Sequence, residues 1–398
     1  MKSEILKLES YLIYLRRLFH EFPELSGNEY NTQLRIIDEL ENLNIKYKRA
    51  GKTSVVAEID TQREGKTLAI RADMDALPIN EDNDYDFKSK NKGLMHACGH
   101  DAHMAILLGT IKILNQYKSQ MNGKIKFLFQ DSEEVGAGAK KLIEEGYLED
   151  VDACIALHQD PLVNTGEIHI AKGKATAATD SVTISFFGEC GHTSTPYLAK
   201  DTIIPACSFV NGLQNIILEK IDNQSQYVVV CSKFQSGIRG NIISPKTDVE
   251  LSIRYFDEET RKKLVSEIKK YANSIAEFYE IKVEVEDTFG CSCTVNDDDI
   301  REKLKEASIK ILGSENVIDS KPKMFSEDLS FIFEKVKGCV IILGSGKLKS
   351  ERIKLNENKP IDDEYTHCLH SEKMKLNEEC MKYGVAIFTE FALEFLKK

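Results

Sequence analysis

Nine residues in the first third of the chain concentrate side chains that bind metals. The segment 95–103 reads MHACGHDAH and contains a cysteine, three histidines and an aspartate. Thiolate and imidazole together suit a borderline metal such as Zn²⁺, and imidazole also binds Mn²⁺. Cys98 and His100 are two positions apart, so in a turn or extended segment they point roughly the same way. We predict that both bind metal, and that His96 and His103 have a supporting or structural role.

Two adjacent carboxylates follow an apolar run at 124–129. The run continues through FLFQDSEE and ends in Glu133 and Glu134. If it is a buried strand, the pair lies at the edge of a sheet, where α/β proteins bind ligands. Neighbouring side chains point in different directions, so one acid can bind metal while the other acts as a base. A solvated acidic pair on the surface is the alternative.

Two isolated histidines add to this pattern. His158 directly follows the apolar run at 151–157, at the end of an expected strand, and His370 lies in THCLHSE before the last expected helix. Neither histidine is diagnostic alone. The weight comes from four stations at plausible strand ends, which together indicate a metal centre: Cys98 with His100, Glu133 with Glu134, His158 and His370.

The elements that position these residues follow an α/β pattern. Strand and helix signals alternate in the first half, which predicts a mixed, largely parallel sheet. The apolar runs indicate buried strands, and the patterns between them indicate helices. The strands are expected at 54–58, 67–71, 124–129 and 151–157, and the helices at about 102–117 and 136–146.

A different order of elements begins near residue 179. It reads β-α-β-β-α-β to about residue 290, which is the ferredoxin-like α+β arrangement. Helical and strand signals then resume and end in an amphipathic helix at about 374–397. We therefore predict an α/β domain in two parts, 1–178 and 291–398, interrupted by an α+β domain at 179–290.

Composition restricts the possible partners and the location. The net charge of −11 argues against binding nucleic acid through the general field, and it also repels anionic membranes. No stretch of 18 apolar residues exists, and the first 22 residues do not read as an export signal. The ten cysteines show no paired framework, so we expect reduced thiols and a cytoplasmic protein.

Nine segments along the whole chain carry a family pattern: LRRLFHEFPELSGNE, AIRADMDALPI, MHACGHDAHMAILLG, FLFQDSEEVGAGAKKLIEEG, ALHQDP, GECGHTSTP, GIRGNIISP, MFSEDLSFI and LHSEKMKLNEE. They resemble the M20 metallopeptidase family, in its amidohydrolase branch of hippurate hydrolases, N-acetyldiaminopimelate deacetylases and auxin-conjugate hydrolases. The resemblance implies a two-metal catalytic domain with an inserted dimerisation or lid domain. Those domains correspond to the α/β and α+β parts described above.

The resemblance also implies a ligand set. By their motifs, the residues that would bind two divalent ions per subunit, Mn²⁺ or Zn²⁺, are Cys98, His100, Glu134, His158 and His370.

Five further residues match positions with other roles in the family. Glu133 matches the general base, and Asp75 in RADMDALP matches an acid that orients a ligand from behind. His192 in GECGHTSTP matches a lid histidine thought to reach the active site of the partner subunit. Asn241 and Arg254 match lid residues that meet the substrate; for Arg254, an ordinary surface position is the alternative.

Some positions are less clear or depart from the family pattern. Asp73 lies in the same motif as Asp75 without a definite counterpart, and Glu327 in SED resembles a site-proximal acid of undefined role. The usual Gln-Pro-Ala-Glu-Glu is Gln-Asp-Ser-Glu-Glu at 130–134, so the loop lacks the constraint of the proline. Gln159 and Asp160 follow His158 where an apolar residue is usual, which bears on substrate preference.

These residues imply a chemistry. Two metals about 3.5–4 Å apart can bridge and activate a water and polarise a carbonyl. Glu133 would move the proton from that water to the leaving amine, and His192 would stabilise the oxyanion. The resemblance therefore implies a homodimeric amidohydrolase that cleaves the amide of a small N-acyl amino acid.

Three alternatives remain at this stage. A dipeptidase or carboxypeptidase would use the same scaffold and chemistry. A non-catalytic metal-binding protein would require the loss of Glu133 or of a ligand, and none is lost. A thiol-redox protein would require a C-x-x-C motif, which the sequence lacks.

Overall fold

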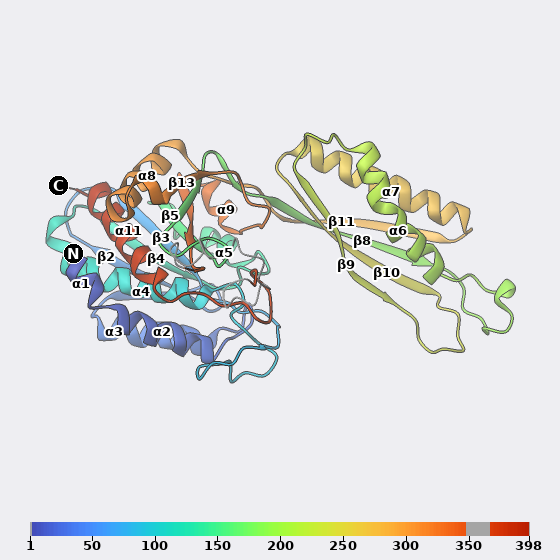
Figure 1. The fold of residues 1–398 in the computed structure, drawn as a ribbon, viewed down its shortest axis with the longest axis horizontal. Coiled ribbons are helices and arrows are strands. Elements are labelled where there is room, and N and C mark those ends of the chain that lie inside the picture. The colour runs from blue at the N-terminus through green and yellow to red at the C-terminus, as the bar shows by residue number, and fades with distance from the viewer. Residues whose placement is uncertain (1, 348–366, 398) are drawn as a thin grey trace, which may run out of the picture. The chain divides into compact units, whose positions relative to one another are not determined.

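The computed structural model describes residues 2–347 and 367–397, which form two compact units (Figure 1). The first unit comprises Met1–Ala175, Val295–Pro322 and Asp328–Lys398. The second comprises Thr176–Thr294 and Lys323–Glu327. The sequence places the corresponding boundaries at 179 and 290, and it assigns 323–327 to the α/β part.

The first unit is built on a mixed eight-stranded sheet in the order β1-β2-β4-β3-β5-β14-β6-β13. The four strands β4, β3, β5 and β14 run parallel, whereas β1 and β2 pair antiparallel with their neighbours. Strand β6 pairs antiparallel with β14 and parallel with β13. Every residue of β3, β5 and β14 is buried, as expected for strands covered on both faces. The strands are β1 Lys46–Ala50, β2 Ser54–Asp60, β3 Thr67–Asp73, β4 Lys124–Gln130, β5 Ala153–Asp160, β6 Ile168–Ala171, β13 Val317–Ser320 and β14 Gly338–Gly344.

Helices enclose this sheet. The central helix α4 is apolar along most of its length and packs on β3, with α2 and α11 against it. The hydrophobic effect buries the apolar surface of α4 and so fixes the position of the helix. His100 is the first residue of that helix. The helices are α1 Lys2–Leu6, α2 Glu9–Glu21, α3 Tyr30–Asn42, α4 His100–Gln116, α5 Gly138–Glu144, α8 Asp298–Leu312, α9 Leu329–Phe333 and α11 Cys380–Phe395.

The last helix is shorter than predicted. It begins at Cys380 and not near residue 374. The residues before it form turns, in which the side chain of Asn377 accepts a hydrogen bond from Glu379 N and its carbonyl accepts one from Cys380 N. An asparagine that bonds to the local backbone in this way competes with helix formation and delays the start of the helix.

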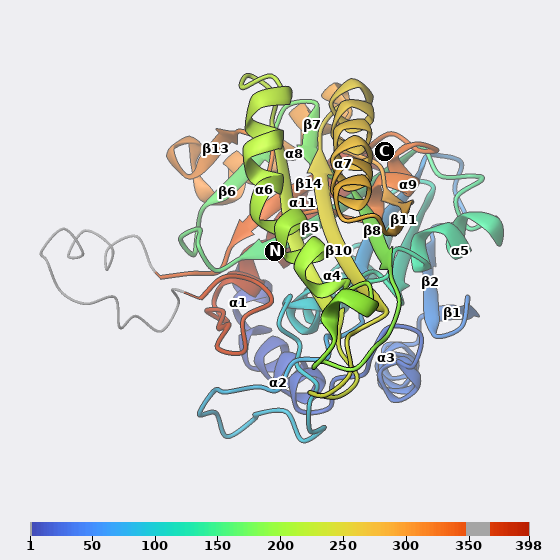
Figure 2. The ribbon, with the colours of Figure 1, turned by 90° about the vertical axis from the view of Figure 1, so that its right-hand side faces the viewer.

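The second unit has the β-α-β-β-α-β order expected from the sequence. Its four strands form an antiparallel sheet in the order β11-β8-β10-β9, and α6 and α7 lie side by side on one face of it (Figure 2). Residues of β8 alternate between buried and partly exposed, because only the helical face is covered. The elements are β8 Ala178–Phe187, α6 Ile203–Lys220, β9 Tyr227–Ser236, β10 Lys246–Tyr255, α7 Glu258–Phe278 and β11 Lys282–Cys291.

Two expectations from composition bear on these units. All ten cysteines carry free thiols. Among the helices of the described residues, none is both long and apolar enough to cross a bilayer.

Candidate metal centre

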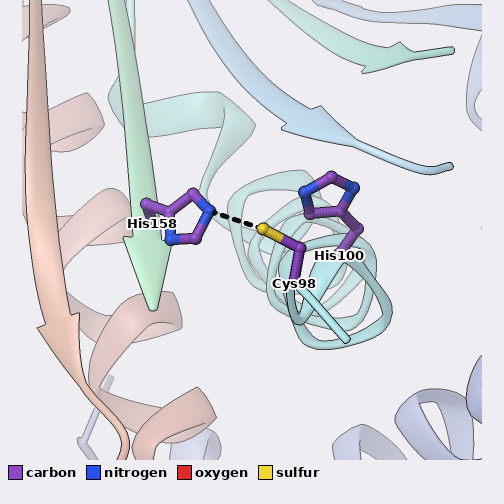
Figure 3. A group of neighbouring side chains, drawn as sticks. All are labelled: Cys98, His100 and His158. Atoms are coloured by element: carbon purple, nitrogen blue, oxygen red, sulfur yellow. Dashed lines mark hydrogen bonds between the residues drawn. The ribbon is translucent and has the colours of Figure 1, made fainter. Parts of the chain in front are cut away.

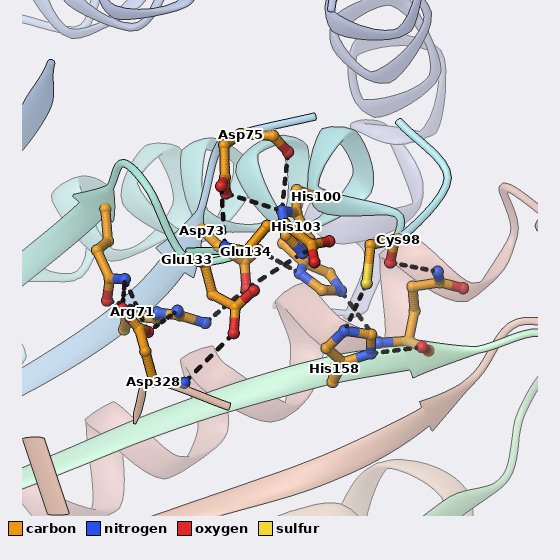
Figure 4. Close-up of polar contacts among 12 residues, drawn as sticks. Arg71, Asp73, Asp75, Cys98, His100, His103, Glu133, Glu134, His158 and Asp328 are labelled. Atoms are coloured by element: carbon orange, nitrogen blue, oxygen red, sulfur yellow. Dashed lines mark hydrogen bonds and ion pairs between the residues drawn. The ribbon is translucent and has the colours of Figure 1, made fainter. Parts of the chain in front are cut away.

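The candidate residues of the first unit gather at one edge of its sheet. Strands β3, β4 and β5 are parallel, so the residues that end or follow them meet at the same edge (Figure 4). Asp75 follows β3, Glu133 and Glu134 follow β4, and His158 is near the end of β5. The N-terminus of α4 supplies His100 to the same edge.

Three buried side chains form one group of potential ligands (Figure 3). The ligand atoms of Cys98, His100 and His158 lie within 4.8 Å of one another, and Cys98 Sγ is 3.4 Å from His158 Nε2. Burial, together with nearby His103, holds the pKa of His158 well below its ordinary value. The ring is therefore neutral, which is the form that binds a metal.

Hydrogen bonds orient both histidine rings of this group. His158 donates from Nδ1 to the carbonyl of Gln159 at 2.7 Å, and His100 donates from Nδ1 to the carbonyl of Asp75 at 2.9 Å. In each ring the proton on Nδ1 is thereby committed to a carbonyl, and Nε2 is the nitrogen that can bind a metal. Backbone carbonyls commonly fix metal-binding histidines in this way.

A second group adds oxygen and a third imidazole. Glu134 Oε1 is 3.4 Å from His370 Nε2 and 4.0 Å from His100 Nε2, and Cys98 lies within the same 4.8 Å limit of Glu134 and His370. Within the described part of the chain, the buried atoms His100 Nε2 and Glu134 Oε1 have no hydrogen-bond partner. Buried polar atoms are rarely left in this state, and a metal ion bound by both would satisfy them. The donor set of sulfur, nitrogen and carboxylate oxygen fits divalent transition metals.

The charge of the site also fits a cation. Burial alone would lower the pKa of His100, but Asp73, Asp75 and Glu134 outweigh it and raise this pKa to about 10. The carboxylates therefore stabilise positive charge at this position. A divalent ion would supply that charge while leaving the ring neutral.

Asp75 links two of the candidate ligands. It lies 3.3 Å from His100 Nδ1 through Oδ1, and its Oδ2 accepts hydrogen bonds from Ser26 Oγ and from the backbone N–H of Glu134. Although burial raises the pKa of Asp75, these partners hold it below its ordinary value. The carboxylate is thus ionised and fixes the positions of both His100 and Glu134.

Asp73 orients His103 and also lies near a candidate ligand, with its Oδ2 3.7 Å from His100 Nε2. Its Oδ1 is 2.6 Å from His103 Nδ1, and its Oδ2 pairs with Arg71 at 2.5 Å. The other ring nitrogen of His103 accepts the backbone N–H of Gln159 at 3.0 Å. His103 therefore connects the end of β3 to the end of β5, a supporting position.

Asp328 is a site residue that the sequence reasoning missed. Its backbone N–H donates to Glu133 Oε1 at 3.3 Å, and its carboxylate accepts hydrogen bonds from Arg71 and Gln130. Burial raises the pKa of Asp328, although Arg71 opposes the shift. The motif SED contains both acids, and the family resemblance points only to Glu327. Only the long-range contact between Asp328 and Glu133 identifies it.

Glu29, a second residue that the sequence reasoning missed, holds the loop after β4 in place. Ser132 has a positive φ of 54°, and its backbone N–H donates to the buried Glu29 Oε1 at 2.9 Å. Thr53 lies between two carboxylates, with its hydroxyl 2.5 Å from Glu29 and 2.8 Å from Asp131. These hydrogen bonds replace the constraint that the sequence comparison suggested was lost with the proline. The loop that carries Glu133 is held on both sides.

Gln159, one of the departures from the family pattern, faces the loop of a candidate ligand. Its side chain is fully buried, and its Nε2 donates to the backbone carbonyl of Cys98 at 2.9 Å. Ser345 Oγ donates to the other end of the same amide. The residue after His158 therefore faces the loop of a candidate ligand.

The remaining candidates belong to the second unit, and they lie at its two ends. A bridge between His192 and Ile242 pairs their loops, so His192 and Asn241 are close and both are exposed. Arg254 is near the other end of β10, where it pairs with Thr179 and donates to Met324 O and Ser326 Oγ. At about 3.3 Å per residue, β10 separates these ends by roughly 25–30 Å. Glu327 is buried in the same unit.

The geometry of His192 defines its tautomer. The backbone N–H of Ser194 donates to His192 Nδ1 at 3.1 Å, and Ser194 Oγ is 2.7 Å from the same nitrogen. Because Nδ1 accepts, the neutral ring carries its proton on Nε2. His192 is therefore prepared to donate a hydrogen bond from Nε2.

Comparison with known proteins gives concordant results. The family model of peptidase family M20/M25/M40 matches residues 69–394 of this chain. Thermostable carboxypeptidase 1 of Saccharolobus solfataricus is 33% identical over 100% of this chain and 98% of its own length. Hippurate hydrolase of Campylobacter jejuni is 32% identical over 99% of both chains. The crystal structure of a dinuclear metal-binding peptidase from Bacillus subtilis superposes with a TM-score of 0.76, at 31% identity over 98% of this chain and 99% of that one.

Proposed function

Because this chain belongs to peptidase family M20/M25/M40, we propose that it is a metal-dependent hydrolase that cleaves the amide of small N-acyl amino acids. The observation that carries the proposal is the convergence of ligand atoms at one sheet edge, with the carboxylate of Glu133 beside them. Relatives named hippurate hydrolase, N-acetylcysteine deacetylase and IAA-amino acid hydrolase act on substrates of this class, as their names state.

Five side chains would hold two divalent ions. Cys98, His100, Glu134, His158 and His370 form the overlapping groups described above, and the orphaned His100 Nε2 and Glu134 Oε1 support this set. The mixture of thiolate, imidazole and carboxylate favours Zn²⁺ or Mn²⁺. When bound, such ions supply an electrophile for the scissile carbonyl and lower the pKa of a water.

Glu133 is proposed as the general base. Its Oε1 is held by the N–H of Asp328, and its loop is braced by Glu29, so the second carboxylate oxygen has a defined direction. Glu133 would accept a proton from the attacking water and transfer it to the departing amine. Proton transfer by a positioned side chain typically contributes about 10²–10⁴-fold to the rate.

His192 is proposed as the oxyanion donor of a neighbouring subunit. Its Nε2–H can donate a hydrogen bond to a substrate. However, β10 separates His192 and Asn241 from the end of the second unit that carries Arg254. The second unit of one subunit cannot bring His192, Asn241 and Arg254 to the same small substrate. In a two-fold dimer, each site would combine Arg254 from one subunit with His192 and Asn241 from the other.

The surface of the second unit supports dimerisation there. Strand β9 is an edge of the sheet and exposes Val230 and Phe234, and α6 exposes Ile204 and Leu218. An exposed apolar edge strand is a template for pairing with another chain. We propose that a second copy of this chain covers it, in a cytoplasmic homodimer.

Substrate and chemistry can be tested together. The metal-reconstituted protein is assayed against N-acetyl, N-benzoyl and dipeptide substrates, with amine release as the readout. We expect the N-acyl amino acids to be cleaved, and activity to disappear after chelation and to return with Mn²⁺ or Zn²⁺. Activity in a chelated protein that metal analysis finds free of metal would contradict the proposal.

The roles of the two adjacent acids have opposite signatures. Glu133→Ala is expected to lower kcat by at least about 10²-fold while keeping two bound ions, because it removes only the base. Glu134→Ala is expected to lose metal. The measurement is metal content by elemental analysis beside turnover. If Glu133→Ala loses metal and Glu134→Ala retains it, the assignment is reversed.

Carboxypeptidase activity is a second candidate, because two thermostable carboxypeptidases are each 33% identical over the whole chain. The same residues would act on a peptide bond. Higher kcat/KM for dipeptides than for N-acyl amino acids in the same panel would favour it.

A further inference from the structure

Gln159 contacts three residues around the proposed metal centre. Its backbone N–H donates to His103 Nε2, and its backbone carbonyl accepts from His158 Nδ1. These two bonds do not depend on the side chain. The side chain makes a third contact, from Nε2 to the carbonyl of Cys98 at 2.9 Å.

The amide of Gln159 is itself held firmly. Ser345 follows β14, is fully buried and donates from Oγ to Gln159 Oε1. The backbone of Ser345 is bound on both sides, by its N–H to the carbonyl of Asp160 and by its carbonyl to the N–H of Asn377. The hydroxyl therefore fixes which end of the amide faces Cys98.

The loop that receives this hydrogen bond has a demanding conformation. Gly99 follows Cys98 with a φ of 86°, and α4 begins at the next residue. A Cβ on Gly99 would overlap the Gln159 amide, so the amide packs directly on the loop. The direction of the Cys98 side chain depends on how this short turn is held.

We infer that Gln159, supported by Ser345, is a positioning residue that fixes the turn presenting the Cys98 thiolate to metal. This inference rests on the proposed metal centre. It gives a role to a position that differs from the usual apolar residue after the histidine. Groups that orient a metal ligand from behind typically contribute about 10–100-fold to metal affinity.

The test uses Co²⁺ as the probe in the full-length chain freed of metal. Thiolate ligation gives a charge-transfer absorption, so titration reports both the affinity and the sulfur–cobalt bond. Gln159→Met keeps the size of the side chain and removes the donor. We expect about 10–100-fold weaker cobalt binding and a weakened or shifted charge-transfer band.

Gln33→Met is the matched control. Gln33 is also a buried glutamine whose Nε2 donates to a backbone carbonyl, that of Ser54, and whose Oε1 accepts from Arg49. This variant is expected to lose thermal stability while its cobalt affinity and absorption stay as in the wild type. A general loss of stability is thereby separated from a change at the metal.

Two outcomes distinguish this inference from the proposed function. If the wild type shows no charge-transfer band that Cys98→Ala removes, the metal assignment fails. If that band is present and Gln159→Met binds cobalt like the wild type, only the positioning role fails. Ser345→Ala gives a second measurement if Gln159→Met does not fold: an unchanged band and affinity in Ser345→Ala would overturn the inference.

Discussion

The carboxylates around the site differ in what they do, and their partners explain why. Asp75 is ionised and holds His100 and Glu134, whereas Glu29 is buried beside a second acid and shares Thr53 with it. A threonine hydroxyl carries one proton and cannot donate fully to two carboxylates at once. The brace of the Glu133 loop is therefore most stable when Glu29 is protonated.

This arrangement predicts a pH-dependent stability that belongs to one residue. Burial raises the pKa of Glu29 from 4.5 to about 7. A group whose pKa is raised on folding stabilises the native state fully below its unfolded pKa, and this contribution is lost as the pH rises through the folded pKa. In the wild type the loss should occur between about pH 4.5 and 7.

Glu29→Gln should remove that loss, because an amide keeps the shape and does not ionise. Relative to the wild type, we expect the variant to gain up to about 3 kcal/mol in free energy of unfolding between pH 4.5 and pH 8. Urea unfolding at the two pH values measures it. Glu24→Gln is the control, since Glu24 also accepts from a backbone N–H and a threonine hydroxyl but is partly exposed. A constant difference between Glu29→Gln and the wild type would refute the shifted ionisation.

The candidate ligands could be predicted from the sequence because they are closely spaced or directly follow apolar runs. The sequence did not identify Glu29 or Asp328, whose contacts with the Glu133 loop join residues 103 and 195 positions apart. No local pattern distinguishes such an acid from a surface acid. It also gave no sign of the contact between Gln159 and Cys98, because only the fold reveals which way a strand-end side chain points.

At the scale of elements, the active edge depends on how α4 begins. Gly99 adopts a left-handed conformation and packs against Gln159, and His100 is the first residue of the helix. The two features act together: the turn redirects the chain, and the buried helix then fixes the ring of His100. The same feature constrains what can replace the glycine.

Gly99→Ala should lower the free energy of unfolding by more than the left-handed backbone conformation alone would cost. A left-handed alanine costs roughly 1–2 kcal/mol. At Gly99 the added Cβ also meets the Gln159 amide, so we expect a larger loss of unfolding free energy together with weaker metal binding. Gly166→Ala is the comparison, because Gly166 has a φ of 88° and nothing within 4 Å of its Cβ position. Equal losses in the two variants, with metal binding intact, would show that the contact with Gln159 is unimportant.

The elements that could be predicted are those with strong burial. Continuous apolar runs identified β2, β3, β4 and β5, and the β-α-β-β-α-β order of the second unit followed from alternation and periodicity. The edge strand β1 was missed because KYKRA is largely exposed and polar. The order of strands in the sheet could not be read either, because pairing between distant segments leaves no mark on either segment alone.

At the scale of the whole molecule, the separation of His192 from Arg254 along β10 predicts a shared site. Glu133→Ala and His192→Ala are each expected to be inactive. If His192 acts in the neighbouring subunit, a mixed dimer has one site with both defects and one with none. Equal mixing makes about half of the dimers mixed, so roughly a quarter of wild-type activity should return after subunit exchange.

A second mixture controls for nonspecific rescue. Glu133→Ala and Cys98→Ala both affect the first unit, so every site in their mixed dimer has a defect and no activity should return. Absence of recovery with His192→Ala, after exchange is demonstrated, would exclude the shared site. A monomer by light scattering would exclude it as well.

Strand order has a consequence for how the chain is made on the ribosome. Strand β14 lies between β5 and β6, yet the chain reaches it only after the whole second unit has been synthesised. Between Asp160 and Gly338, translation at about 5–20 residues per second takes roughly 10–35 seconds. Through that time β5 and β6 lack the neighbour that separates them. The second unit, whose main body is one continuous segment, can fold during the same interval. The nascent first unit therefore lacks β14 and His370 until the second unit has been made, so the protein is expected to capture metal only after that point.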